Sequence, residues 1–160
     1  MKALVVYHSY TGQTRMIAEK IKEKLNCDIL DLKSTVPFST DYQSVVDEYQ
    51  SNESDKKIIE IENISIDLKQ YDKVIIGSPV WWYTITPVVR SFLTKYNLSN
   101  KEIYPFATNA GCLGRTFKEV ESICNGNIYE GLNVVFSEDY REKKCITKED
   151  DIVKWIEKIK

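Results

Sequence analysis

The chain has 160 residues, of which 42% are hydrophobic and 29% are charged, and this length and composition suit one globular domain over residues 1–160. A formal net charge of −2 leaves no strongly basic surface, which argues against nucleic acid and an anionic membrane as partners. The first apolar run stops at His8 and no run approaches the length of a membrane span, so we expect a cytoplasmic protein.

The cysteine and histidine content argues against a metal site. None of the four cysteines belongs to a Cys-x-x-Cys pair, and the chain contains one histidine. Zinc and iron–sulfur sites need clusters of such ligands. We therefore expect no bound metal, and we expect the cysteines to be free thiols.

The chain opens with strand, helix and strand. The apolar run at residues 3–7 predicts a buried strand, and residues 28–32 predict a short second strand whose charged residues suit the edge of a sheet. Between the two strands, apolar residues recur with helical spacing at Ile17, Ala18, Ile21 and Leu25.

Residues 34–63 are the least regular part of the sequence. Thr40 and Gln43 have the spacing of a capping box, which predicts the start of a helix. The apolar face of that helix would comprise Tyr42, Val45, Val46 and Tyr49. The polar run at residues 51–57 carries no structural signal. We interpret the region as a solvated connector with one helix, and a lid over a ligand is the alternative.

Three further units of strand and helix follow. The strands are predicted at residues 73–78, 103–107 and 132–136. Pro105 is unexpected in a central strand, because proline cannot donate a hydrogen bond to a neighbouring strand. Thr86 and Pro87 form an N-cap followed by proline at the first helical position, and Thr147 and Asp150 mark the start of the last helix. This alternation predicts a parallel sheet with helices on both faces.

The loop after the first strand, residues 9–14, contains three hydroxyl side chains and one glycine. A helix N-terminus presents backbone N–H groups and a positive dipole end, which favour an anion. A simple N-cap is the alternative, but it needs one hydroxyl, and no Glu or Gln follows Thr11 or Thr14 at capping-box spacing. We therefore predict a phosphate site. The loop has neither the Gly-Lys-Ser/Thr of a nucleotide triphosphate loop nor the Gly-x-Gly-x-x-Gly of a dinucleotide site.

A second unusual loop, residues 79–83, places three aromatic side chains at the end of a strand. A flat ring system can stack on such side chains. Because consecutive side chains point to opposite sides, we expect one of Trp81 and Trp82 to pack into the core instead.

Residues 108–114 form the third unusual loop. Thr108 and Asn109 offer polar contacts, and at Gly111 and Gly114 the backbone can approach the edge of a ring closely. A glycine-containing loop is by itself weak evidence for a ligand site. This one is considered because it directly follows a predicted strand.

The three loops together resemble those of a known family. Ser-Tyr-Thr-Gly-Gln-Thr at residues 9–14, Gly-Ser-Pro-Val-Trp-Trp-Tyr at residues 77–83 and Thr-Asn-Ala-Gly-Cys-Leu-Gly at residues 108–114 are similar in order and spacing to the phosphate loop and the two flavin loops of the flavodoxin-like family. The resemblance implies an α/β three-layer sandwich, with a five-stranded parallel sheet in the order 2-1-3-4-5, and FMN as the cofactor. In that order strands 1, 3 and 4 are neighbours, so the three loops would share one crevice.

The resemblance also implies a set of FMN-binding residues. Those for the phosphate are Ser9, Thr11, Gly12, Gln13 and Thr14. Those for the flavin ring are Pro79, Val80, Trp81, Trp82, Tyr83, Thr108, Asn109, Ala110 and Gly111. Cys112 is bulkier than the residues typical of this loop, and we interpret it as a bystander rather than a redox-sensitive thiol. His8 is interpreted as a spacer or a weak phosphate contact, and no residue is assigned a catalytic role.

Two functions fit such a protein. The first is electron transfer through bound FMN to redox partner proteins, which needs no substrate pocket. The second is an NAD(P)H-dependent FMN reductase of quinones, flavins or similar acceptors, which needs room above the flavin for a nicotinamide. The near-neutral charge counts against the first, because carriers of this family are usually acidic, and no nucleotide fingerprint supports the second. We favour the electron carrier, as a monomer or weak dimer.

Overall fold

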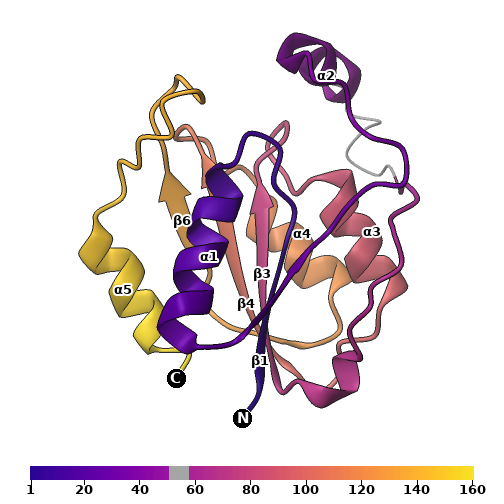
Figure 1. The fold of residues 1–160 in the computed structure, drawn as a ribbon, viewed down its shortest axis with the longest axis vertical. Coiled ribbons are helices and arrows are strands. Elements are labelled where there is room, and N and C mark those ends of the chain that lie inside the picture. The colour runs from indigo at the N-terminus through magenta and orange to yellow at the C-terminus, as the bar shows by residue number, and fades with distance from the viewer. Residues whose placement is uncertain (51–57) are drawn as a thin grey trace.

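The computed structural model describes residues 1–50 and 58–160, and its strands form one sheet between two layers of helices (Figure 1). The strands are β1 (Ala3–Tyr7), β2 (Asp28–Asp31), β3 (Lys73–Pro79), β4 (Glu102–Asn109), β5 (Asn127–Ile128) and β6 (Leu132–Val135). Their order is β2-β1-β3-β4-β5, with β6 also paired to β4, and these pairings are parallel. The predicted order 2-1-3-4-5 is confirmed, with the fifth position shared by two short strands.

Helices cover both faces of the sheet. They are α1 (Gln13–Leu25), α2 (Tyr42–Tyr49), α3 (Pro87–Lys95), α4 (Thr116–Ile123) and α5 (Glu149–Glu157), with a short 3₁₀ helix η2 (Leu68–Gln70). Figure 1 shows α1 and α5 together on one face and α3 and α4 on the other. In the same view α2 lies apart from both layers, beyond the carboxyl ends of the strands. No helix in the described part of the chain is long and apolar enough to cross a membrane.

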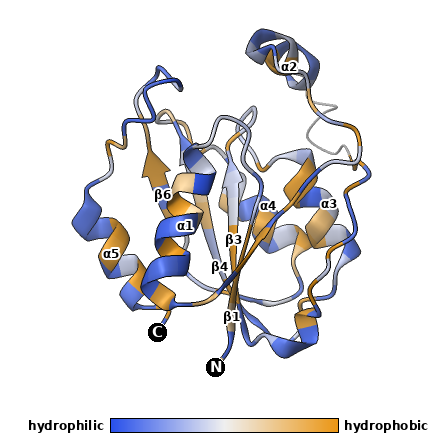
Figure 2. Ribbon diagram, in the orientation of Figure 1, coloured by the Kyte–Doolittle hydropathy of each residue, from blue (hydrophilic) through white to orange (hydrophobic). Residues whose placement is uncertain are grey.

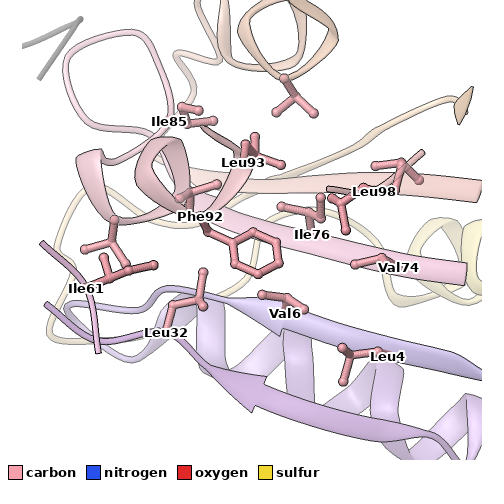
Figure 3. Close-up of a cluster of buried hydrophobic side chains, with 14 of the residues drawn as sticks. Leu4, Val6, Leu32, Ile61, Val74, Ile76, Ile85, Phe92, Leu93 and Leu98 are labelled. Carbon is pink, nitrogen blue, oxygen red and sulfur yellow. The ribbon is translucent and has the colours of Figure 1, made fainter. Parts of the chain in front are cut away.

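Each face of the sheet buries its own hydrophobic cluster. Alternate residues of β1 point to opposite faces, so Leu4 and Val6 join one cluster while Val5 and Tyr7 join the other. In the first cluster, Phe92 of α3 points toward β1 and β3 (Figure 3). Figure 2 shows hydrophobic residues along the strands and on the inner sides of the helices. Burial on both faces fixes the strand register, since a slip by one residue would exchange the two faces.

Pro105 lies within β4, in the interior of the sheet. The carbonyl of Ile103 accepts a hydrogen bond from the N–H of Tyr129, so Ile103 and, two residues later, Pro105 turn their backbone polar groups away from β3. On that side β5 pairs with residues 102–103 and β6 with residues 106–109. Pro105 therefore lies at the gap between β5 and β6. A backbone N–H at this position would have no neighbouring strand to bond, so proline is tolerated there.

Two helix starts test the capping predictions. For α3, the hydroxyl of Thr86 accepts a hydrogen bond from the N–H of Val89, as predicted. For α2, the cap is Asp41, whose carboxylate accepts from the N–H of Ser44. The prediction of Thr40 as the cap is therefore wrong by one residue, because the carboxylate of Asp41 bonds the N–H three residues after it and caps the helix instead.

The last helix, α5, begins at Glu149, later than the predicted cap at Thr147. The hydroxyl of Thr147 accepts a hydrogen bond from the N–H of Val135 in β6 at 2.8 Å. A bond to the sheet thus takes the place of the predicted cap.

His8, directly after β1, is a buried titratable residue. The residue is 5% exposed, and its Nδ1 lies 2.9 Å from the hydroxyl oxygen of Thr86. Burial disfavours the charged imidazolium and lowers the pKa of His8 from 6.5 to about 4. Protonation of His8 therefore opposes folding.

A buried ion pair joins α3 to α4. Arg90 is 3% exposed, and its Nε donates a hydrogen bond to Glu119 Oε1 at 2.7 Å. Glu119 also accepts from the hydroxyl of Thr84, and Arg90 donates to the carbonyl of Ile85. Both charged groups are largely buried, so the attraction between them has to offset the free energy that each loses by leaving water.

We expect His8 to make the stability of the fold depend on pH between about 4 and 6.5. In this range the unfolded chain binds a proton that the folded chain does not, so stability is complete above pH 6.5 and is lost as the pH falls toward 4. The loss should reach about 3 kcal/mol, since one pKa unit is worth about 1.4 kcal/mol. Urea unfolding of the parent and of His8→Gln over this range measures the effect. A difference between the two proteins that does not change with pH would contradict it.

We expect Arg90→Met to lower the free energy of unfolding by about 3–5 kcal/mol, because it leaves the carboxylate of Glu119 buried without its cation. The double variant Arg90→Met, Glu119→Met removes both charges and should recover part of the loss. Urea unfolding at neutral pH compares the two variants. If the double variant is the less stable of the two, the ion pair is not the cause.

Candidate functional site

Loops at the carboxyl ends of β1, β3 and β4 meet around one cavity of about 300 Å³. The loop after β6 and one residue of α2 complete its walls. The lining side chains are Tyr10, Thr11, Gln13, Tyr42, Pro79, Val80, Trp81, Trp82, Tyr83, Thr108, Asn109, Ala110, Cys112, Ser137, Glu138 and Tyr140. The crevice expected between the three loops is therefore present.

Most of the residues predicted to bind a ligand line this cavity. The predicted residues that belong to the loops but do not line the wall are Ser9, Gly12, Thr14 and Gly111. The lining residues outside the predicted set are Tyr10, Tyr42, Cys112, Ser137, Glu138 and Tyr140. Those from α2 and from the loop after β6 carry no local motif, because tertiary packing alone brings them to the site.

The three hydroxyls of the first loop have different surroundings. Thr11 lines the cavity. Ser9 Oγ accepts a hydrogen bond from the N–H of Arg15, in the first turn of α1, at 3.2 Å. Thr14 is 1% exposed, and its Oγ1 lies 2.7 Å from Oγ1 of Thr108, so it ties the first loop to the third. One hydroxyl thus faces the cavity while two fix the shape of the loop.

The N-cap residue of α1 is Gly12, whose φ of 99° lies in the left-handed region. Gly12 has no side chain that could bond the N–H groups of the first turn. Arg15, the nearest cation in the sequence, points elsewhere, since it donates to Asp31 Oδ2 at 2.6 Å and to the hydroxyl of Tyr7 at 3.1 Å. The loop itself therefore offers an anion backbone N–H groups and the helix dipole.

The second loop is a tight turn with an unusual sequence. Trp81 and Thr84 exchange two backbone hydrogen bonds, of 2.9 and 3.3 Å, around Trp82 and Tyr83. Both central residues have a positive φ, 48° and 70°, which is typical of a turn made by asparagine and glycine. Such strained positions cost about 1–3 kcal/mol each and cluster at functional sites.

The third loop holds this strained turn in place. The N–H of Arg115 donates to the carbonyl of Tyr83 at 2.8 Å. Gly114 leaves room for the contact, because a Cβ there would lie 2.3 Å from the same carbonyl oxygen. The turn therefore presents Trp82 and Tyr83, which are 38% and 47% exposed, at the cavity wall rather than in the core.

Trp81 points into a cluster of rings. Its ring lies edge-on to Phe38, Tyr10 and His8, at centroid distances of 5.1, 5.7 and 5.6 Å. Trp81 is only half-buried, belongs to neither hydrophobic cluster and lines the main cavity beside Trp82, so the prediction that one of the two tryptophans packs into the core is wrong. Of the two interpretations of His8, the structure favours the spacer over the weak phosphate contact, because its buried ring is bonded to Thr86 and does not line the cavity.

The backbone of the third loop is braced from both sides. The carbonyl of Thr108 accepts from the N–H of Val80 at 2.9 Å. The side chain of Asn109 accepts from the N–H of Gly111 at 2.9 Å and donates to Asn133 at 2.6 Å. Gly111 has a φ of 112°, and no atom lies within 4 Å of the place where its Cβ would be. The loop is therefore fixed at its base and open at Gly111.

A second cavity, of about 220 Å³, adjoins the first along α2. Its lining residues are Tyr10, Tyr42, Val45, Val46, Tyr49, Val80, Trp81 and Trp82. Tyr42 also stacks on Tyr140 from the loop after β6, with 4.2 Å between centroids and 9° between planes. The helix predicted to carry Tyr42, Val45, Val46 and Tyr49 is therefore confirmed, and it lies beside both cavities. The polar run at residues 51–57 lies outside the described residues.

The chemistry of the main cavity suits a ligand with an anionic end and a flat apolar end. The helix N-terminus and Thr11 form the polar end, and Trp82 and Tyr83 form the aromatic end. Within residues 1–50 and 58–160, no group of three or more histidine, cysteine or carboxylate side chains is placed to hold a metal ion.

Comparison with known proteins agrees with this arrangement. The family model for flavodoxin matches residues 2–159. A flavoprotein from Lactobacillus acidophilus NCFM, solved in complex with FMN, is 27% identical, with a TM-score of 0.69 over 82% of this chain and 91% of that chain. A flavoprotein from Bacteroides eggerthii DSM 20697 is 25% identical, with a TM-score of 0.72 over 99% of this chain and 97% of that one.

A more distant structure shares the fold. Oxidised flavodoxin 2 from Bacillus cereus is 17% identical, with a TM-score of 0.56 over 99% of each chain. The comparison with curated proteins finds no match. Since the family model spans nearly every residue and the sheet order agrees, this chain belongs to the flavodoxin family.

Proposed function

We propose that this protein binds FMN in the main cavity and transfers electrons through the bound flavin. The observation that carries the proposal is the meeting of a helix N-terminus and an aromatic wall in one cavity of about 300 Å³. FMN has a phosphate at one end and a flat ring system at the other. Family membership and the FMN complex of the Lactobacillus acidophilus relative support the same ligand.

The residues present fit the phosphate of FMN. The first turn of a helix leaves N–H groups without intrahelical acceptors, and the left-handed Gly12 lets the chain turn sharply into α1. Thr11 and Gln13 line the same end of the cavity and add side-chain donors. Ser9 and Thr14 act on the loop rather than on the ligand, through their bonds to Arg15 and Thr108.

The residues present also fit the flavin ring. Trp82 and Tyr83 offer exposed aromatic faces, and the third loop offers open backbone near Gly111. When bound, FMN supplies the reversible redox chemistry, and the protein positions the ring and controls what surrounds it. Glu138 is the carboxylate on the cavity wall, so it adds negative charge beside the ligand.

NAD(P)H-dependent reduction of a small acceptor is the second candidate function. The cavity of about 220 Å³ along α2 supports it, because this space shares Tyr10, Trp81 and Trp82 with the main cavity. A second small molecule could therefore lie next to the first. An electron carrier does not need such a space.

We expect Thr11→Ala to weaken FMN binding by about 1.5–3 kcal/mol, the worth of a hydrogen bond to a charged group. Thr14→Ala should weaken it as well, because the bond of 2.7 Å between the first and third loops is lost. Quenching of flavin fluorescence on titration gives the dissociation constants. Thr94→Ala is the control, since its hydroxyl bonds within α3. Unchanged affinity in both test variants would refute the phosphate assignment.

Adding NADPH or NADH to the FMN-loaded protein without oxygen separates the two functions. We expect the visible absorbance of the flavin to persist with either nucleotide alone and to fall when a flavodoxin reductase is added with NADPH, as a carrier requires. Rapid bleaching by the nucleotide alone would instead identify the protein as a reductase. A protein that takes up no FMN would exclude both functions.

A further inference from the structure

The loop between β6 and α5, residues 136–148, brings a lysine to the phosphate loop. A Cβ on Gly12 would lie 2.9 Å from Lys143 Nζ and 3.1 Å from Lys143 Cε. The lysine side chain therefore lies directly against Gly12, at the N-terminus of α1. The absence of a side chain on Gly12 creates the space that the lysine uses.

The loop is built in a way that fixes the place of this lysine. The N–H of Ser137 donates to the carbonyl of Lys144 at 2.8 Å, and Phe136 forms an antiparallel bridge with Cys145. The hydroxyl of Ser137 donates to Glu142 at 3.0 Å. Lys143 itself has a φ of 49°, in the left-handed region that a lysine seldom adopts. The chain thus doubles back on itself and presents Lys143 at its turn.

Two arginines close in sequence to the phosphate loop and to Lys143 are engaged elsewhere. Arg15 pairs with Asp31 at 2.6 Å, and Arg141 pairs with Asp139 at 2.8 Å. Across residues 1–50 and 58–160, no carboxylate lies within ion-pair distance of Lys143. Its charge is therefore available to an anion at the N-terminus of α1.

We infer that Lys143 contacts the phosphate of the bound flavin nucleotide and makes the site select FMN over the unphosphorylated riboflavin. This inference rests on the proposed FMN site. Backbone N–H groups carry only partial charge, whereas the ammonium of Lys143 brings a full positive charge to Gly12, at the N-terminus of α1.

The test compares FMN and riboflavin on the parent and on Lys143→Gln. We expect the dissociation constant of FMN to rise about tenfold at low ionic strength, because a charge-assisted hydrogen bond is lost from an exposed position. The dissociation constant of riboflavin should not change. The affinity for FMN should also become less sensitive to added salt, since salt screens exposed charges. Lys143→Arg should retain the discrimination, and Lys143→Glu should lose more than Lys143→Gln.

Lys144→Gln is the matched control, because it removes the same charge from the next residue of the same loop. An FMN dissociation constant that rises equally in Lys143→Gln and Lys144→Gln would overturn the inference and point to the net charge of the loop. An equal rise for FMN and riboflavin in Lys143→Gln would overturn it in favour of a change in loop shape. Binding of FMN to the parent tests the proposed function separately, since these comparisons concern only the variants.

Discussion

The position of β3 between β1 and β4 is the constraint on which the site depends. β3 pairs with β1 over residues 73–77 and with β4 over residues 73–79, so three parallel strands end at one edge of the sheet. Gly77 permits this close packing, because a Cβ there would lie 2.1 Å from the ring of Phe106 on β4. Parallel strands deliver their following loops to the same place, where a bond such as that between Thr14 and Thr108 joins segments far apart in the sequence.

Positive φ angles occur at the site for two different reasons. At Gly12 the left-handed backbone turns the chain into a helix, and glycine adopts it without strain. At Trp82 and Tyr83 the same conformation is strained, because glycine and asparagine adopt it far more readily than aromatic residues do. The bond from Arg115 to Tyr83 and the packing of Gly114 hold that turn. These contacts therefore stabilise a strained backbone at the position where it places an aromatic ring at the cavity wall.

Local patterns, namely apolar runs and clusters of glycine, hydroxyl and aromatic residues, predict the parallel sheet and the three loops, whereas the order of the strands comes from the resemblance to the flavodoxin-like family. The sequence does not predict features that depend on contacts between residues far apart in the chain. A count of hydroxyls cannot show that Thr14 bonds Thr108 while Thr11 faces the cavity. Pro105 looks misplaced until the gap between β5 and β6 is known. Tyr140 has no neighbouring motif, since its stacking partner lies on α2.

The β6–α5 loop serves both ends of the main cavity. Tyr140 lines the cavity and stacks on Tyr42, while Lys143, three positions later in the chain, lies against Gly12. Because α2 and this loop meet in the Tyr42–Tyr140 stack, the aromatic wall of the cavity and the lysine beside Gly12 belong to one connected surface. The three sequence motifs supply the other walls of the cavity. In the proposed function α2 and this loop border the approach to the ligand and carry no motif of their own, so the motifs alone do not separate a carrier from a reductase.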